Sequence, residues 1–367
     1  MTLPPVSILG VGAVTPIGRD LATIADRLGL APSPGTTGEG RGEGSSAIVE
    51  SASSSQQTPH PTFSRSTGRG TEENTRRVPD EFLADPATNK RLRRADRFTR
   101  MAVIAASDAW ASAQPSLAGV PMERIGLIVA SGFGPHGRGF KFLDGILDHG
   151  DDAALPTDFS HSVHGAPAAY ITELLGMRGP SLSVTDFVSG FEQSVQLAQC
   201  WIEQGACDRV LVGVVEELGE VLLHCAGRLL NHDQRVIPGE GAVFWMLGRA
   251  ELPGLATLGA GPVPQSVDLL IRESPAIGLA SPTTDSLSAS QSTTFNPYFG
   301  HSPSSAAFQL LGGLLSIQAR KALGKVLDVS VPVSVRVDNV ATFRPSFDSS
   351  AATLLLTKKN SEPGRST

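Results

Sequence analysis

The chain has 367 residues, of which 40% are hydrophobic and 18% are charged, and its formal net charge is -6. This length suits one large domain or two fused domains, and the composition is that of an ordinary globular protein. The small acidic excess gives no indication of nucleic-acid binding, and no run of about 18 apolar residues predicts a membrane span.

From the N-terminal segment and the cysteines we expect a cytoplasmic protein. The opening residues 1–18 lack a basic region and contain Pro and Gly, so they do not resemble a signal peptide. The three cysteines, Cys200, Cys207 and Cys225, form no CxxC pair and indicate buried thiols in a reducing compartment. No metal site and no cofactor is expected from these patterns.

Hydrophobic periodicity predicts an ordered start and then a long interruption. An apolar strand is predicted at 6–14 and a short helix at about 18–29. Residues 32–75 are rich in Ser, Thr, Gly and Pro and cannot bury enough surface to offset the entropy of ordering, so we expect a mobile surface loop. Helices are then predicted at 89–113, 164–176 and 189–205, and strands at 124–131, 180–187, 209–217 and 242–248.

The patterns after residue 250 are weaker. The elements predicted there are a strand at 256–261, a helix near 266–273, a Ser/Thr-rich stretch at 280–295, a helix at 303–323, and strands at 331–339 and 351–359. Because strands alternate with helices and are almost continuously apolar, we expect an α/β fold whose parallel or mixed sheet is covered on both faces. Residues 360–367 are expected to form a frayed tail.

Six segments carry a family resemblance, and they occur in the family's order. They read ILGVGAVTPIG, RRADRFTRMAVIAA, LLGMRGPSLSVTDFVSGFEQSVQLA, LVGVVEE, DQRVIPGEGAVFWML and GHSPSSAAFQLLGGLLSIQ. Together they resemble the β-ketoacyl synthase family. The resemblance implies a thiolase-like layered αβαβα architecture made of two related halves, with 1–250 as the first half and 251–359 as a shortened second half.

Three departures from the family pattern concern the catalytic residues. The resemblance places the nucleophilic cysteine at Phe187, and a phenyl ring can neither attack a thioester nor carry an acyl group. It places a lysine at Asn296, and the usual first histidine falls in a window, 233–300, that contains no histidine. His301 is retained. The condensation chemistry is therefore expected to be absent, and Phe187 is expected to pack into the core as a plug.

Other candidate residues have simpler interpretations. Cys200 is too far along its predicted helix to replace the nucleophile, and Gly10-x-Gly12 lacks the third glycine of a dinucleotide fingerprint. His161 and His164 lack a third ligand for a metal. The basic run from Lys90 to Arg100 could steer an acidic acyl carrier protein, but a solvated helix face with internal ion pairs is favoured.

The resemblance and the lost residues together predict a non-condensing subunit of the chain-length-factor type. Such a subunit would form a heterodimer with an intact ketosynthase through segments 156–170 and 180–191, and would shape the partner's acyl tunnel while an acyl carrier protein delivers substrate. Chain-length factors of aromatic polyketide systems usually carry Gln where this chain has Phe187, which favours an aryl-polyene or other reduced-polyketide pathway.

Two further functions are left open by the sequence. One is an active ketosynthase-like acyltransferase that uses His301 as a base and needs no covalent intermediate. The other is a homodimer that binds a carrier protein or a lipid without a ketosynthase partner.

Overall fold

The computed structural model describes residues 3–30, 75–84, 90–220, 223, 237–260, 266–272, 288–319, 322–326, 329–333, 339–345 and 351–359. Three predictions therefore lie wholly or partly outside the described residues: the loop at 32–75, apart from its last residue, the tail at 360–367, and the first half, 280–287, of the Ser/Thr-rich stretch at 280–295. The expected division at residue 250 stays a prediction.

The elements predicted before residue 250 are all present, but the helix predicted at 89–113 begins only at Arg97, and residues 90–94 form a turn before it. The elements are β1 (Val6–Val14), α1 (Leu21–Arg27), α2 (Arg97–Ser112), β2 (Ile125–Ser131), α6 (Ala166–Leu175), β3 (Ser181–Thr185), α7 (Gly190–Glu203), β4 (Arg209–Glu216) and β5 (Gly241–Arg249). The boundaries follow local chemistry. Asp96 begins α2 by accepting a hydrogen bond from the Thr99 N–H at 2.9 Å, and Gly176 ends α6 in the left-handed conformation.

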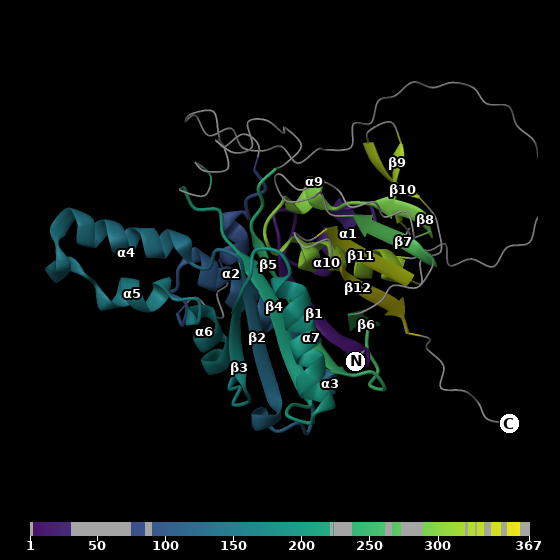
Figure 1. Cartoon of the computed structure of the whole chain (residues 1–367), viewed down its shortest axis with the longest axis horizontal. Coiled ribbons are helices and arrows are strands. Elements are labelled where there is room, and N and C mark those ends of the chain that lie inside the picture. Colours follow the sequence, from purple (N-terminus) through teal and green to yellow (C-terminus); the bar gives the residue numbers. More distant parts are fainter. Residues whose placement is uncertain are drawn as a thin grey trace, which may run out of the picture.

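Several short elements of this part were not predicted. They are three 3-10 turns, η1 (Asp80–Leu83), η2 (Met122–Arg124) and η3 (Asp151–Ala153), and three helices, α3 (Gln114–Leu117), α4 (His136–His149) and α5 (Pro156–Ser162). Helix α4 contains three glycines, which lower its helix propensity, and none of its residues is buried, although Phe140, Leu143 and Leu147 recur at helical spacing. Helices α4 and α5 form a hairpin that projects from the body of the molecule (Figure 1). We call this hairpin, residues 136–162, the arm.

The second part of the chain requires three corrections. Its elements are β6 (Ala256–Ala260), β7 (Ser266–Arg272), β8 (Ser288–Thr293), α9 (Asn296–Phe299), α10 (Ser305–Ala319), β9 (Ala322–Val326), β10 (Val329–Val333), β11 (Asn339–Pro345) and β12 (Ala351–Lys358). The helix predicted near 266–273 is wrong, because β7 is a strand that pairs with β11 and β8. A short apolar run does not distinguish the two states. The helix predicted at 303–323 ends at Ala319, and the strand predicted at 331–339 is divided between β10 and β11.

The sheet repeats one arrangement twice. Its order is β3-β2-β4-β5-β1-β6-β12-β11-β7-β8. In the first five strands, β3, β2 and β4 are parallel, and β5 and β1 each pair antiparallel to their neighbour. Read from the other end, β8, β7 and β11 are parallel, and β12 and β6 pair antiparallel in the same way. This repetition confirms the expected two related halves, which join where β1 pairs with β6.

Two cores lie on the two faces of the first five strands. In β5, Phe244 and Met246 belong to the core beneath α2 and α6, whereas Val243 and Trp245 belong to the core around α7 and α10. This alternation is the two-residue period of a strand that is covered on both faces. Helices α7 and α10 contact each other and strands of both halves, so they form the central layer (Figure 1).

The glycines of β1 serve close packing. A Cβ on Gly12 would lie 2.2 Å from the Ala105 carbonyl oxygen, and one on Gly10 would lie 2.7 Å from that of Ala109. Both contacts are with the backbone of α2, which explains the Gly10-x-Gly12 pair without a nucleotide. Within the described part of the chain, every helix is too short or too polar to cross a lipid bilayer.

Candidate functional site

The elbow between β3 and α7 carries Phe187 at the surface of the chain. Strand β3 ends at Thr185 and α7 begins at Gly190, so residues 186–189 form the turn. The Phe187 side chain is 57% exposed. The expectation that Phe187 is packed as a core plug is therefore wrong for the single chain, because β3 is the end strand of the sheet and no described element covers it.

Hydrogen bonds from one carboxylate hold this turn. Asp186 Oδ1 accepts from the N–H of Val188 at 2.7 Å and of Ser189 at 2.6 Å. Gln193, one turn into α7, donates its Nε2 to Asp186 Oδ2 at 3.3 Å and to Ser189 Oγ at 2.8 Å. The elbow is thus a turn closed by an aspartate side chain, a pattern for which Asp is well suited.

A row of aromatic rings continues from Phe187. Its ring centroid lies 5.1 Å from that of Phe133, in an edge-to-face arrangement. Phe133 lies 6.1 Å from the ring of His136, which lies 6.5 Å from the ring of Phe140 on the first turns of α4. Phe133, Phe140 and Phe187 are all exposed, so the row forms an apolar surface at the base of the arm.

A buried carboxylate connects this surface to the start of α10. Glu216, the last residue of β4, accepts from the Gly132 N–H at 2.5 Å and from the Phe133 N–H at 3.4 Å. It also accepts from the hydroxyls of Ser131 at 3.2 Å and Ser304 at 2.6 Å. Complete burial raises the pKa of Glu216, and these hydrogen bonds oppose the rise. Glu216 therefore fixes the loop that carries Phe133 against the residues that follow His301.

His301 and Asn296 lie beside this junction. The His301 Nδ1 is 3.2 Å from both the N–H and the carbonyl oxygen of Ile237, and the backbone of His301 pairs with residues 237–239. Asn296 is buried, and its Oδ1 accepts a hydrogen bond from Gln309 Nε2. Behind them the rings of Phe295, Phe299 and Phe308 pack together in the core. The side chain of Asn296 is a neutral amide and carries no positive charge.

The comparisons with known proteins assign the family. A family model described as "Beta-ketoacyl synthase, N-terminal domain" matches residues 4–238. The chain belongs to the β-ketoacyl synthase family. No curated protein sequence matches the chain.

Solved structures similar to this ketosynthase-family chain share its fold. "The ishigamide ketosynthase/chain length factor" is 17% identical with a TM-score of 0.72, covering 98% of this chain and 100% of that one. A complex named AntDE:AntF, a type II PKS acyl-carrier protein with its ketosynthase bound to the hexaketide, is 15% identical with a TM-score of 0.66, covering 97% and 99%. A β-ketoacyl synthase from Burkholderia phymatum STM815 is 14% identical with a TM-score of 0.68, covering 98% and 100%.

The basic run of this ketosynthase-family chain divides into two parts. Arg97 is engaged internally: its Nη2 lies 2.6 Å from Glu240 Oε1, its Nη1 lies 2.5 Å from Asp80 Oδ1, and it also donates to the Val78 carbonyl. Arg97 and Glu240 come from two of the resemblance motifs, RRADRF and GEGA, so these motifs meet as a structural ion pair. Lys90, Arg91, Arg93 and Arg94 are exposed.

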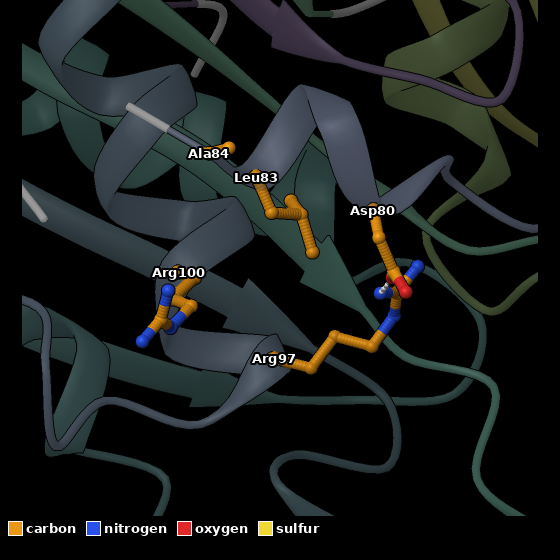
Figure 2. Close-up of a pocket in the computed structure, with 5 residues that line it drawn as sticks. All are labelled: Asp80, Leu83, Ala84, Arg97 and Arg100. Atoms are coloured by element: carbon orange, nitrogen blue, oxygen red, sulfur yellow. Dashed lines mark hydrogen bonds and ion pairs between the residues drawn. The ribbon is translucent and has the colours of Figure 1, made fainter. Parts of the chain in front are cut away.

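An open hollow of about 400 Å³ lies beside this ion pair. Figure 2 shows the residues of α2 and η1 that line it: Asp80, Leu83, Ala84, Arg97 and Arg100. Arg100 donates its Nε to the Ala95 carbonyl at 3.0 Å, so both arginines of the hollow already bind groups of the chain. The hollow is formed by structural contacts on the α2 side and contains none of the residues at the elbow.

His161 and His164 make structural contacts. His161 is buried, with Nε2 2.8 Å from the Tyr170 hydroxyl and Nδ1 2.6 Å from the Thr157 carbonyl. His164 is exposed and packs against Gly134. Among the described residues, no group of three or more His, Cys, Asp or Glu side chains could hold a metal ion.

Two residues at the base of the arm were missed by the sequence analysis. Glu217 Oε1 accepts from the Gly137 N–H at 2.8 Å, and His136 Nε2 accepts from the Gly219 N–H at 3.1 Å. These reciprocal bonds join the end of β4 to the start of α4. Burial raises the pKa of Glu217 to about 7 and lowers the pKa of His136. Sequence spacing gave no signal, because the two residues are 81 positions apart along the chain.

Proposed function

We propose that this chain is a non-condensing, chain-length-factor-like subunit that pairs with an active ketosynthase and shapes the acyl tunnel of the partner. The loss of chemistry is the first support. Condensation needs a thiolate at the elbow to carry the acyl group, and the elbow has Phe187. The lysine position has the neutral, buried Asn296. Parts of the window in which the first histidine is missing, residues 233–236, 261–265 and 273–287, lie outside the described residues, so this loss remains a sequence argument.

The observation that carries the proposal is a large exposed apolar face. It combines the end strand β3, where Leu182 is 42% exposed, the elbow with Phe187, and the arm, where Leu147 is 81% and Phe159 is 56% exposed. Phe140, Leu143 and Leu155 are exposed on the same hairpin, and Phe133 and Val163 are exposed just before and just after it. We call these residues the β3–arm face. Soluble chains seldom leave an edge strand and so many large apolar side chains uncovered, so a protein partner is expected to cover them.

A chain of the same fold is the partner that fits best. The end strand offers unpaired backbone groups that a second edge strand can satisfy, and the projecting arm can lie along a neighbouring surface (Figure 1). Segments 156–170 and 180–191, which the family resemblance assigns to the dimer interface, contain Phe159, Val163, Leu182 and Phe187 of this face. An active ketosynthase would supply the nucleophile that this chain lacks.

The aromatic row supports the tunnel-shaping part of the proposal. Phe187, Phe133 and Phe140 lie on the β3–arm face, so a partner that covers the face would have these rings beside its own elbow. Rigid rings close a cavity at a fixed depth, and an acyl chain that exceeds this depth must distort or leave. A phenyl ring in place of the Gln of aromatic-polyketide relatives favours a reduced chain, such as an aryl polyene.

Substrate delivery by an acyl carrier protein is part of the same proposal. The structure named AntDE:AntF has an acyl carrier protein in complex with a ketosynthase of this fold. The exposed basic side chains at 90–94 are the surface on which this chain could attract an acidic carrier protein.

Co-expression with each intact ketosynthase of the same host tests the proposal. We expect a stable heterodimer with one of them, and Leu182→Asp is expected to weaken its formation at least tenfold because it places a charge in the interface. Ala22→Asp, on the exposed side of α1, is the control and should leave association unchanged. A chain that forms only a homodimer and ignores every ketosynthase would contradict the proposal and favour a carrier- or lipid-binding homodimer.

A further inference from the structure

The loop between β2 and α4 is wrapped around one carboxyl group. Glu216 Oε1 accepts from the Gly132 N–H at 2.5 Å, and Glu216 Oε2 accepts from the Phe133 N–H at 3.4 Å. The Gly134 N–H donates at 2.8 Å to Ser131 Oγ, which in turn donates to Glu216 Oε2 at 3.2 Å. Three consecutive peptide N–H groups are therefore bound by Glu216, either directly or through one hydroxyl.

Close packing on both sides of the loop restricts its position further. A Cβ on Gly132 would collide with the ring of Pro303, in the turn that precedes α10. Gly134 has a φ of +64°, which favours glycine, and a Cβ there would collide with the His164 ring. Phe133 is thus the one residue of 132–134 that has a side chain, and it is exposed between two buried glycines. The loop presents a single ring at the surface.

This ring is central to the aromatic row. The Phe133 ring lies between those of Phe187 and His136, at centroid distances of 5.1 and 6.1 Å. Glu216, which holds the loop, is the last residue of β4, and the backbone there is paired with Gly241 of β5. The Ser304 hydroxyl donates to Glu216 Oε1 at 2.6 Å from the side of α10. A carboxyl group fixed by a central strand is a rigid base from which to place a surface ring.

We propose that Glu216 is a positioning residue that sets the depth of the acyl tunnel by holding Phe133 at one place on the β3–arm face. The inference rests on the proposed function, and it names the buried group that gives a tunnel-shaping ring its position. Without this carboxyl group, the glycines on both sides of Phe133 would let the ring move, and the cavity would accept acyl chains of several lengths. Product length would then depend on a residue that is buried beneath the face.

Amide hydrogen exchange of the isolated chain tests the positioning. Glu216→Gln keeps the shape of the side chain but has one acceptor oxygen in place of two, so it can bind only part of the loop. We expect residues 132–134 to exchange about tenfold faster, the effect of losing one buried hydrogen bond, while residues 125–130 of β2 keep their rates. Glu217→Gln is the matched control. It makes the same change at the next residue, whose carboxyl group accepts from the Gly137 N–H, and should leave 132–134 unchanged.

Two results of this measurement would overturn the inference. One is unchanged exchange at 132–134 in Glu216→Gln. The other is equal acceleration throughout β2, which would give Glu216 a general structural role. If Glu216→Gln does not fold, Ser131→Ala takes its place, because it removes the acceptor of the Gly134 N–H. Exchange at Gly134 should then be faster than in the natural chain, and an unchanged rate would overturn the inference equally.

Product length separates this inference from the proposed function. In a heterodimer with an intact ketosynthase, Glu216→Gln should broaden the distribution of acyl chain lengths, measured by mass spectrometry of carrier-bound products. Glu203→Gln, at an exposed residue of α7, should leave the distribution unchanged. A heterodimer that keeps the natural distribution with Glu216→Gln would overturn the inference and leave the proposed function intact. Failure of the natural chain to pair with any ketosynthase would contradict the proposed function, and hydrogen exchange would still decide whether Glu216 positions Phe133.

Discussion

The Arg97–Glu240 ion pair, called the junction below, is a buried charge, and the β3–arm face is an exposed apolar surface. Both are the reverse of the usual distribution, in which charged side chains are exposed and apolar ones are buried. At the junction, a carboxylate with a fully buried side chain binds an arginine and the N–H groups of Val78 and Leu218. At the β3–arm face, leucine and phenylalanine side chains are exposed. Buried charge persists where hydrogen bonds satisfy it, and exposed apolar surface persists where a partner can cover it. The comparison predicts that the junction controls folding and the face controls association.

The largest effect is expected from Arg97→Ala. The substitution removes the closer of two arginines that pair with the buried Glu240 and leaves only Arg77, whose Nε lies 3.8 Å from Oε1, which should destabilise the fold by about 3 kcal/mol. Urea unfolding measures the change. Arg124→Ala is the control, because the Arg124–Asp208 pair is partly exposed and screened by solvent, so its loss should destabilise the fold much less. Equal effects of the two substitutions would show that burial does not distinguish these ion pairs.

Glu217 should make stability depend on pH. Its pKa of about 7 in the folded chain is raised from 4.5, so the folded state holds a proton that the unfolded state releases. The raised pKa of Glu217 therefore adds to the free energy of unfolding in full below pH 4.5, and this contribution is lost as the pH rises through 7. The difference is on the order of 3 kcal/mol.

Glu217→Gln should therefore flatten the pH profile. Relative to the natural chain, the variant should gain stability between pH 5 and pH 8, because Gln can still accept the Gly137 N–H and carries no charge. Urea midpoints at the two pH values measure the gain. A profile with the same slope as that of the natural chain would assign the pH dependence to other groups.

Phe187→Ala tests the contrast between exposed and buried aromatic residues. Because Phe187 is mostly exposed and its ring packs edge-to-face on that of the exposed Phe133, we expect a loss of less than about 1 kcal/mol. Phe98→Ala, in the core beneath α2, should cost about 3–5 kcal/mol and is the comparison. A large loss from Phe187→Ala would mean that the elbow belongs to the folding core.

The smallest change in stability is expected from Leu147→Asp on the arm. Its side chain is almost entirely exposed in the single chain, so the free energy of unfolding should stay within about 0.5 kcal/mol. Association with a ketosynthase partner should nevertheless be weakened, which size-exclusion chromatography of the co-expressed pair would show. If Leu147→Asp destabilised the chain without changing its association, the arm would contribute to folding and not to partner binding.

Part of the fold was predictable because it is encoded locally. Strand β1 has the predicted bounds of Val6 and Val14, since a run of small and apolar residues with two glycines favours a buried strand over a helix. Helix α7 was also predicted, together with its end near Gly205. The arm was missed, because its three glycines lower the helix propensity of α4 and obscure the apolar residues that recur at helical spacing. The same holds for β7, whose short apolar run becomes a strand only by pairing with β8 and β11.

The sequence by itself determined that the chain belongs to the β-ketoacyl synthase family, and it predicts that Phe187 and Asn296 stand at the nucleophile and lysine positions. These conclusions depend on residue identity and order. Only the tertiary structure decided that Phe187 is exposed, that Asp186 occupies the N–H groups of the elbow, and that Glu217 is buried against the start of α4. Burial and hydrogen bonding depend on elements that are distant in sequence, and local sequence patterns do not predict which of these elements contact each other.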